Sequence, residues 1–284
     1  MNPKNEHVHI GEILDVNGRR YDGEAGRIIG DVTVIHRSKR GNVMFTRTLH
    51  DHNDLLVTGA VFLSEKANNM RSGFITTAND VSLGVHTADQ LVIDDTTIPE
   101  EKIAGIMVGN GGSGDTYNTV YKVDRSALTV PSPVPFRVVP VAEDLSGETR
   151  KKYFLRVVRG DYAYYYGKTF DIDREICVLY EDGTTVPVDA DTSSSSGKFV
   201  RVFSRYRAVL DAEDIREFFK VNYGSTLRSL INSVGLVTGY PGVASDGSYD
   251  EFFNVRTMTT MNMENQELKD SESTVTFIYR LFIQ

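Results

Sequence analysis

Three glycines in the segment 109–114 have the spacing of a dinucleotide-binding fingerprint. Gly109, Gly111 and Gly114 match G-x-G-x-x-G and directly follow the apolar run 103–108 (IAGIMV). The fingerprint requires a helix after the loop, because the pyrophosphate binds at the N-terminus of that helix. Residues 115–121 (DTYNTVY) are β-branched and aromatic, which favours a strand. We therefore predict a turn of residues with positive φ that closes a central strand and binds no nucleotide.

Two other segments contain part of a pattern for phosphate binding or hydrolysis. Gly167-Lys168-Thr169 matches the end of a P-loop, but Tyr162 stands where that pattern requires its first glycine. A hydrolase nucleophile elbow would be centred on Ser113, but position 115 is aspartate where glycine is required. Neither pattern is complete, and acidic pairs are too numerous among 39 Asp and Glu residues to single out a catalytic couple. No enzymatic activity is predicted.

Two histidine pairs have a spacing that suits metal binding. His7 and His9, and likewise His50 and His52, would lie on one face of a strand. No third cluster of Cys or His accompanies them, and histidine pairs are common in polar arms and turns. We predict no metal at either pair.

Residues 189–193 (DADTS) begin like a calcium-binding loop. The sixth position is Ser194 and the twelfth is Val200, whereas the loop requires Gly and Glu there. A solvated turn is predicted. No cofactor is expected anywhere in the chain.

Cys177 is the only cysteine, so the chain cannot form an internal disulfide. It lies in the apolar run 175–179 (EICVL), whereas a reactive thiol needs an electropositive and partly exposed environment. We predict a buried structural cysteine.

Four tyrosines lie close together in the segment 162–166. Tyr162, Tyr164, Tyr165 and Tyr166 would form an aromatic platform for a sugar or a protein partner if their rings were exposed. The alternative is ordinary packing of aromatic side chains within a sheet. Both interpretations stay open at this point.

The composition indicates a globular protein and excludes several classes. The 284 residues are 40% hydrophobic and 25% charged, and the longest apolar runs fall far short of the roughly 18 residues that span a membrane. The N-terminus has no apolar segment typical of a cleaved secretion signal. The net charge of −8 argues against general nucleic-acid binding.

The pattern of apolar residues predicts mostly strands. Residues 31–35 and 43–49 form a β-hairpin, and residues 55–67 and 211–219 have the spacing of two short helices. The Pro-rich segment 129–140 is expected to be an extended connector. Further strands are predicted at 81–85, 103–108, 117–123, 153–158, 162–166, 174–180, 198–209, 230–237, 252–258 and 274–283.

These elements predict a mainly β fold, either a β-sandwich or a barrel-like domain, with two short helices. Residues 1–27 are interpreted as an N-terminal arm, and residues 28–284 as a single structural domain. Within that domain, residues 129–200 are interpreted as an inserted β-rich region or subdomain.

Several short motifs resemble those of structural proteins of tailed-bacteriophage virions. In that family a hairpin leads to an N-L-V-x-x-G segment and a short helix, and later segments carry G-x-G, I-N-E-x-G-L and F-x-R-x-T-F. Asp54 interrupts the first of these motifs here, and Ser233 stands where an acid is common. The matching segments are 30–34, 41–43, 52–60, 103–111 with 115–116, 230–236, 253–258 and 274–283.

The resemblance implies a non-enzymatic building block at the head–tail neck, the collar or the baseplate. Its expected partners are copies of itself and other virion proteins, and its expected location is the virion, assembled in the host cytoplasm. Candidate partner contacts are the four tyrosines and the three spaced glycines, with the arm and the Pro-rich segment as candidates for wrapping a neighbour. A carbohydrate-binding or receptor-contact module is the alternative that the tyrosines favour.

Overall fold

The computed structural model describes most of the chain from residue 29 onward. The predicted strand at 81–85, both histidine pairs and the segment 189–193 lie outside the described residues. Of the predicted arm, only β1 (Ile13–Leu14) and β2 (Arg20–Tyr21) are described, and they pair antiparallel. The described residues are 13–14, 20–21, 29–49, 54–69, 101–116, 119–122, 130, 132–170, 172–188, 198–227, 229–243, 250–268 and 273–282.

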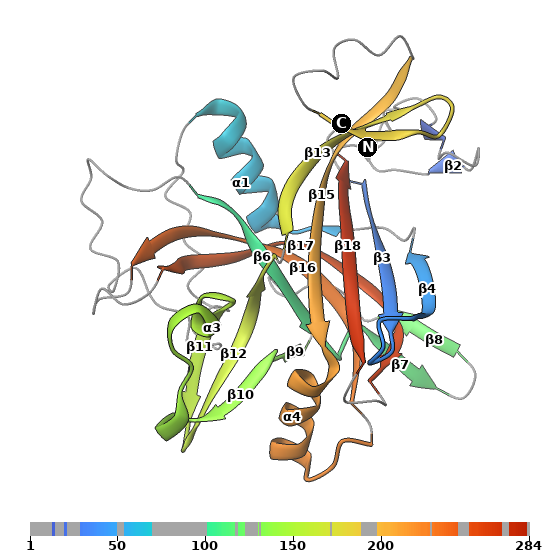
Figure 1. The fold of residues 1–284 in the computed structure, drawn as a ribbon. Helices are drawn as coiled ribbons and strands as arrows, with labels where there is room; N and C mark the ends of the chain where they lie inside the picture. Colours follow the sequence, from blue (N-terminus) through green and yellow to red (C-terminus); the bar gives the residue numbers. More distant parts are fainter. Residues whose placement is uncertain are drawn as a thin grey trace, which may run out of the picture.

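The architecture is mainly β and consists of two antiparallel sheets (Figure 1). This confirms the predicted fold class in its sandwich-like form, because the described strands of each sheet follow an open order and do not close into a barrel. β7 (Ser113–Thr116) and β8 (Thr119–Lys122) form a separate two-stranded ribbon.

The six-stranded sheet has the order β14-β13-β15-β18-β3-β4. The predicted hairpin is confirmed, because β3 and β4 pair across a turn in which Gly41 has a φ of 77°. The strands of this sheet are β3 (Ile29–Arg37), β4 (Val43–Leu49), β13 (Ile172–Tyr180), β14 (Thr185–Pro187), β15 (Phe199–Asp211) and β18 (Thr274–Phe282).

The eight-stranded sheet has the order β10-β12-β6-β16-β17-β5, with β11 paired to β12 and β9 paired to β6. Its two longest strands are neighbours, and three register shifts interrupt their pairing. The strands are β5 (Asp54–Leu55), β6 (Lys102–Gly109), β9 (Pro133–Val134), β10 (Arg137–Pro140), β11 (Tyr153–Arg159), β12 (Tyr162–Thr169), β16 (Leu230–Val243) and β17 (Asp250–Glu267).

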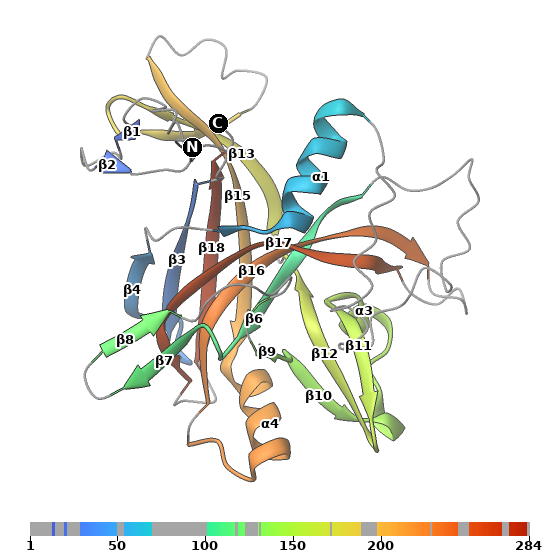
Figure 2. The same ribbon diagram turned by 180° about the vertical axis from the view of Figure 1, so that it is seen from behind.

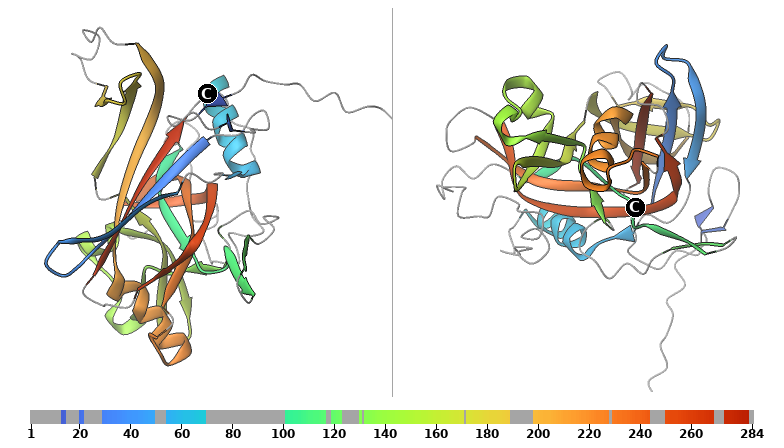
Figure 3. Two further views of the ribbon diagram at one scale, coloured as in Figure 1. Left: turned by 90° about the vertical axis from the view of Figure 1, so that its right-hand side faces the viewer. Right: turned by 90° about the horizontal axis from the view of Figure 1, so that it is seen from below.

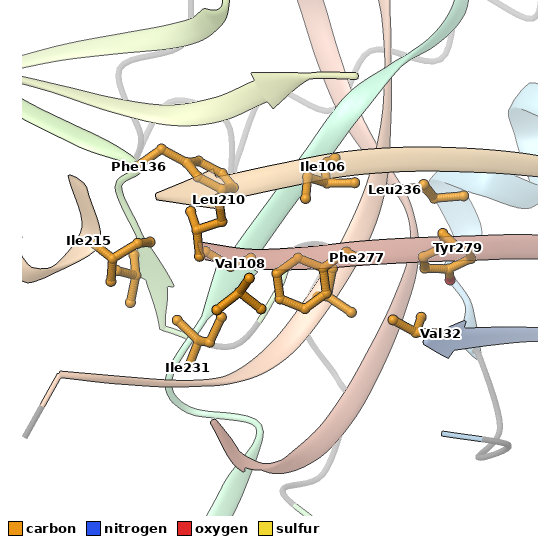
Figure 4. Packing of buried hydrophobic residues seen from close by; sticks show 14 of the residues in the cluster. Val32, Ile106, Val108, Phe136, Leu210, Ile215, Ile231, Leu236, Phe277 and Tyr279 are labelled. Carbon is orange, nitrogen blue, oxygen red and sulfur yellow. The ribbon is translucent and has the colours of Figure 1, made fainter. Parts of the chain in front are cut away.

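One hydrophobic core joins the two sheets (Figure 4). Val32, Phe277 and Tyr279 contribute side chains from the six-stranded sheet, and Ile106 and Leu236 contribute them from the eight-stranded sheet. Alternate residues of β18 supply the core, as the period of two in a strand requires.

The two predicted helices are present at opposite ends of the molecule (Figures 2 and 3). α1 (Val57–Asn68) buries Phe62, and α4 (Ala212–Tyr223) buries Ile215 and Phe219, which are four residues apart on one helix face. The structure adds two short elements that were not predicted, η3 (Val141–Glu143) and α3 (Gly147–Lys151).

The prediction that the Pro-rich segment is only a connector is wrong for residues 132–140. β9 pairs with β6 and β10 pairs with β12, and Phe136 is fully buried. The prolines are tolerated because these strands are only two and four residues long and Pro140 ends β10, where a missing N–H costs little. Because this segment packs into the core of its own chain, it is not available to wrap a neighbour.

The region interpreted as an insertion, 129–200, contributes to both sheets. Its strands β9 to β12 belong to the eight-stranded sheet, whereas β13 and β14 belong to the six-stranded sheet. The described part of this region is therefore continuous with the two layers.

Candidate functional site

The glycine loop after β6 connects two strands. β6 ends at Gly109, and Ser113 already begins β7, which pairs antiparallel with β8. A strand thus occupies the place where the dinucleotide fingerprint requires a helix. This segment does not build the helix N-terminus that binds a pyrophosphate.

Gly112 is the glycine of this loop whose lack of a side chain matters most. Its backbone N–H donates to Oδ1 of Asn232 at 2.7 Å. A Cβ atom here would lie 2.6 Å from the carbonyl oxygen of Asn232 and 2.7 Å from Oδ1 of Asn262. The prediction of positive φ is wrong for Gly109 and Gly111, neither of which is among the described glycines with that conformation. Close approach to β16 and β17 is what requires glycine.

A cluster of buried polar groups lies beside Gly112. Among the described residues, four buried side-chain atoms lack a hydrogen-bond partner, namely Oγ of Ser233, Oγ1 of Thr260, and both polar atoms of the Asn262 amide. Ser233 and Asn262 are cross-strand neighbours on β16 and β17. The cluster contains only hydroxyl and amide groups, which bind water but do not act as acids or bases near neutral pH.

The four tyrosines do not form a shared platform. Tyr164, Tyr165 and Tyr166 are buried, and only Tyr162 is exposed, at 38%. The reason is the position of β12, which lies between other strands and is covered on both faces. Of the two interpretations left open by the sequence, ordinary packing within a sheet therefore holds for these three tyrosines, and the exposed platform that favoured a carbohydrate-binding module is not formed.

Tyr165 instead belongs to an internal polar network with Asp144. The Tyr165 hydroxyl donates to Oδ1 of Asp144, and Nε of Arg156 donates to its Oδ2 at 2.7 Å. Burial by itself would raise the pKa of Asp144, but the hydrogen bonds from Tyr165 and Arg156 outweigh it and hold this pKa below its usual value. The network ties the segment before α3 to β11 and β12.

A second network attaches α4 to the eight-stranded sheet. Asp214, in the first turn of α4, accepts a hydrogen bond of 2.8 Å from the Tyr153 hydroxyl and forms an ion pair with Arg137. Burial raises the pKa of Asp214, and burial together with the nearby Asp214 charge raises the pKa of Tyr153 well above its ordinary value. Both side chains are almost completely buried, which indicates a structural contact.

The third network holds α1 on β17. Arg256 is buried and donates to the carboxylates of Glu101 and Glu65, and the Thr238 hydroxyl donates to Glu101 at 2.7 Å. Ion pairs in such an environment require good geometry to offset the loss of hydration. Because these groups satisfy one another, they fix the helix in place.

The cysteine prediction is confirmed, since Cys177 is buried and its thiol is free. Burial raises the pKa of Cys177, which lowers the reactivity of the thiol. Within the described residues, no three His, Cys, Asp or Glu side chains are grouped as metal ligands. No described helix has the length and apolar character needed to cross a membrane.

The edge of the six-stranded sheet formed by β4 exposes apolar side chains. Val43, Met44 and Phe45 are 57%, 64% and 44% exposed. β4 is the last strand of its sheet among the described residues, and its hairpin projects from the body of the molecule (Figure 3). Such an edge presents unpaired N–H and C=O groups together with apolar side chains.

A second exposed apolar surface lies at the far end of β13 and β15. Ile176 on β13 and Val202 on β15 are 56% and 42% exposed, and their positions in the register place them on the same face as Tyr206 and Leu210 of the core. β13 and β15 extend beyond β16 and β17, so that the second sheet does not cover this end (Figure 1). We call Ile176, Val178 and Val202 the apolar face.

A family model described as "Family of unknown function (DUF7208)" matches residues 102–281, which is more than half of the chain. The chain belongs to this family. Neither a curated protein nor a solved structure matches it. In this DUF7208 protein the glycine loop, the polar networks at Asp144 and Asp214 and the apolar face lie inside the matched region, whereas β4 precedes it.

The sequence did carry a signal for the apolar surface at β4 of the DUF7208 chain. Val43, Met44 and Phe45 are consecutive apolar residues, whereas a strand with one buried face alternates. The apolar face gives no such signal, because the consecutive apolar residues 176–179 are equally typical of a strand that is buried on both faces. Only the extent of the second sheet leaves Ile176 and Val202 uncovered.

Proposed function

We propose that this protein is a structural building block of a tailed-phage virion that assembles with copies of itself and with other virion proteins at the neck, the collar or the baseplate. The motifs that resemble virion structural proteins support this function. The proposed site of action is the virion, after assembly in the host cytoplasm.

The observation that carries the proposal is the apolar face. Apolar side chains on the end of a sheet gain about 25 cal/mol for each Å² that a partner covers. Ile176, Val178 and Val202 lie on three neighbouring positions across two strands, with Val186 of β14 opposite Val178. This arrangement suits a protein contact, because interface centres are apolar and poor in charge.

The direct test is mass spectrometry and cryo-electron microscopy of particles purified from cells that produce this chain. We expect the chain in the particles at a constant copy number, with its density at the neck, the collar or the baseplate. Particles that form normally without containing the chain would contradict the proposal.

The apolar face is tested by the double variant Ile176→Lys/Val202→Lys. We expect a loss of at least about tenfold in incorporation into particles, because burying two ammonium groups in an apolar contact is strongly unfavourable. Val141→Lys is the matched control, since Val141 is a similarly exposed valine in η3. Equal incorporation of both variants would show that the apolar face is not a contact surface.

A further inference from the structure

We infer that β4 is a strand-addition surface that pairs antiparallel with β4 of a second copy of this chain. The inference rests on the assembly function proposed above and names one contact surface and its occupant. It is carried by three observations, namely the length of the open edge, the apolar residues on it and the self-complementary register.

The other outer strands of the two sheets are shorter or more highly charged than β4, which carries one arginine and one bulge. β10 has four residues and ends in Pro140. β14 has only three residues and ends in Pro187, and β5 has only two residues. β11 has seven residues like β4, but it carries Arg156 and Arg159. Short strands, prolines and charges are the usual ways in which proteins protect sheet edges.

β4 presents an edge that is regular over residues 45–49 and apolar at its other end. Residues 45–49 pair with β3 without interruption, and a register shift leaves Met44 as the extra residue of a bulge. The only charged side chain of β4 is Arg47, which forms an ion pair with Glu264 of β17. No strand borders its outer side among the described residues.

The sequence of β4 favours pairing with itself. A two-fold axis at Thr46 places Thr46 opposite Thr46 and Phe45 opposite Arg47 of the other copy. Phe45 and Arg47 lie on the same face of the strand, so that each guanidinium meets an aromatic ring across the junction. An axis at Arg47 would instead place two like charges opposite each other, which is unfavourable. The charges therefore disfavour the register centred on Arg47, and the contact between Phe45 and Arg47 favours the one centred on Thr46.

Disulfide trapping of the full chain tests this register. In an antiparallel pair, the two Cα atoms of opposed residues lie about 4.5–5.5 Å apart, which is within the range of a disulfide. We expect the variant Thr46→Cys to form a covalent dimer under mild oxidation at least about tenfold faster than the control Val158→Cys, because pairing raises the effective thiol concentration. The native Cys177 is buried, so it does not compete.

The control is matched because Val158 is an exposed residue near the end of β11, the other outer strand of seven residues. Equal rates of dimer formation for Thr46→Cys and Val158→Cys would overturn the inference. If the chain is nevertheless found in particles, the assembly function stands and only the β4 contact fails.

A second measurement does not depend on a new thiol. Sedimentation of the full chain over a range of concentrations should show self-association that Phe45→Lys weakens at least about tenfold and Val158→Lys leaves unchanged, since a charge at an edge blocks pairing. Circular dichroism verifies that both variants are folded. A wild-type chain that stays monomeric at all concentrations would overturn the inference.

Discussion

At the scale of single residues, the buried Asp214 and the half-buried Asp144 show how local contacts shift the pKa of a carboxyl group. Asp214 is more deeply buried, and burial raises its pKa despite the nearby Arg137. Asp144 retains part of its hydration and receives hydrogen bonds from Tyr165 and Arg156, so its pKa falls. The lowered pKa of Asp144 means that its ionised form stabilises the folded state, whereas the raised pKa of Asp214 means that its protonated form is the one favoured by folding.

We predict that Asp144→Asn lowers the free energy of unfolding at neutral pH by about 1–3 kcal/mol, because it removes charge-assisted hydrogen bonds. The folded state lowers this pKa, so the ionised group stabilises the fold above the usual pKa of 3.8, and the contribution is lost as the pH falls through the folded value. Urea denaturation between pH 2 and pH 7 should show a shallower loss of stability in acid for the variant. Glu148→Gln, at an exposed carboxylate of α3, is the control and should retain the wild-type acid dependence.

At the scale of elements, the glycine loop between β6 and β7 packs closely against β16 and β17. Gly112 contacts Asn232 on β16 through a hydrogen bond, and Asn262 on β17 lies directly below it. Because those contacts involve backbone and a neighbouring buried side chain, they cannot yield without moving the sheet or the loop.

We predict that Gly112→Ala destabilises the protein by about 1–3 kcal/mol, the usual cost of overpacking a tight site. Guanidinium denaturation measures this change, and limited proteolysis should show faster cleavage of the β6–β7 connection. Gly160→Asn at the β11–β12 turn is the control, because nothing lies within 4 Å of a Cβ atom there and asparagine tolerates its positive φ. Unchanged denaturation of Gly112→Ala would contradict the close approach.

At the scale of the whole molecule, a hydrophobic core shared by both sheets makes them interdependent. Phe277 of the six-stranded sheet and Ile106 of the eight-stranded sheet belong to the same buried cluster (Figure 4). Neither sheet can lose its partner without exposing the core to water, so we expect one cooperative unfolding transition.

We predict that Phe277→Ala lowers the free energy of unfolding by about 3–5 kcal/mol. Hydrogen exchange should show reduced protection in both sheets, because both unfold together. Val158→Ala, at an exposed position, should change the stability by less than about 0.5 kcal/mol. Reduced protection confined to β18 and its neighbours would indicate that the sheets unfold separately.

The sequence by itself determined most of the longer elements, whereas β9, β10, η3 and α3 were not predicted. Two β-rich runs separated by a turn predicted the β3–β4 hairpin, a continuous apolar run predicted β6, and β-branched and aromatic content predicted β18. Helical spacing of apolar residues predicted α1 and α4. The apolar setting of Cys177 also indicated its burial. These features are local, because the period of the side chains sets which face each element buries.

Only the tertiary structure decided which of these residues are buried, which are closely packed and which stay exposed. The burial of three tyrosines depends on the strands on either side of β12, and the need for glycine at position 112 depends on β16 and β17. The exposure of β4 and of the apolar face likewise depends on where the neighbouring strands end. Strand pairing joins residues far apart in the sequence, so a local pattern does not show where the neighbouring strands end.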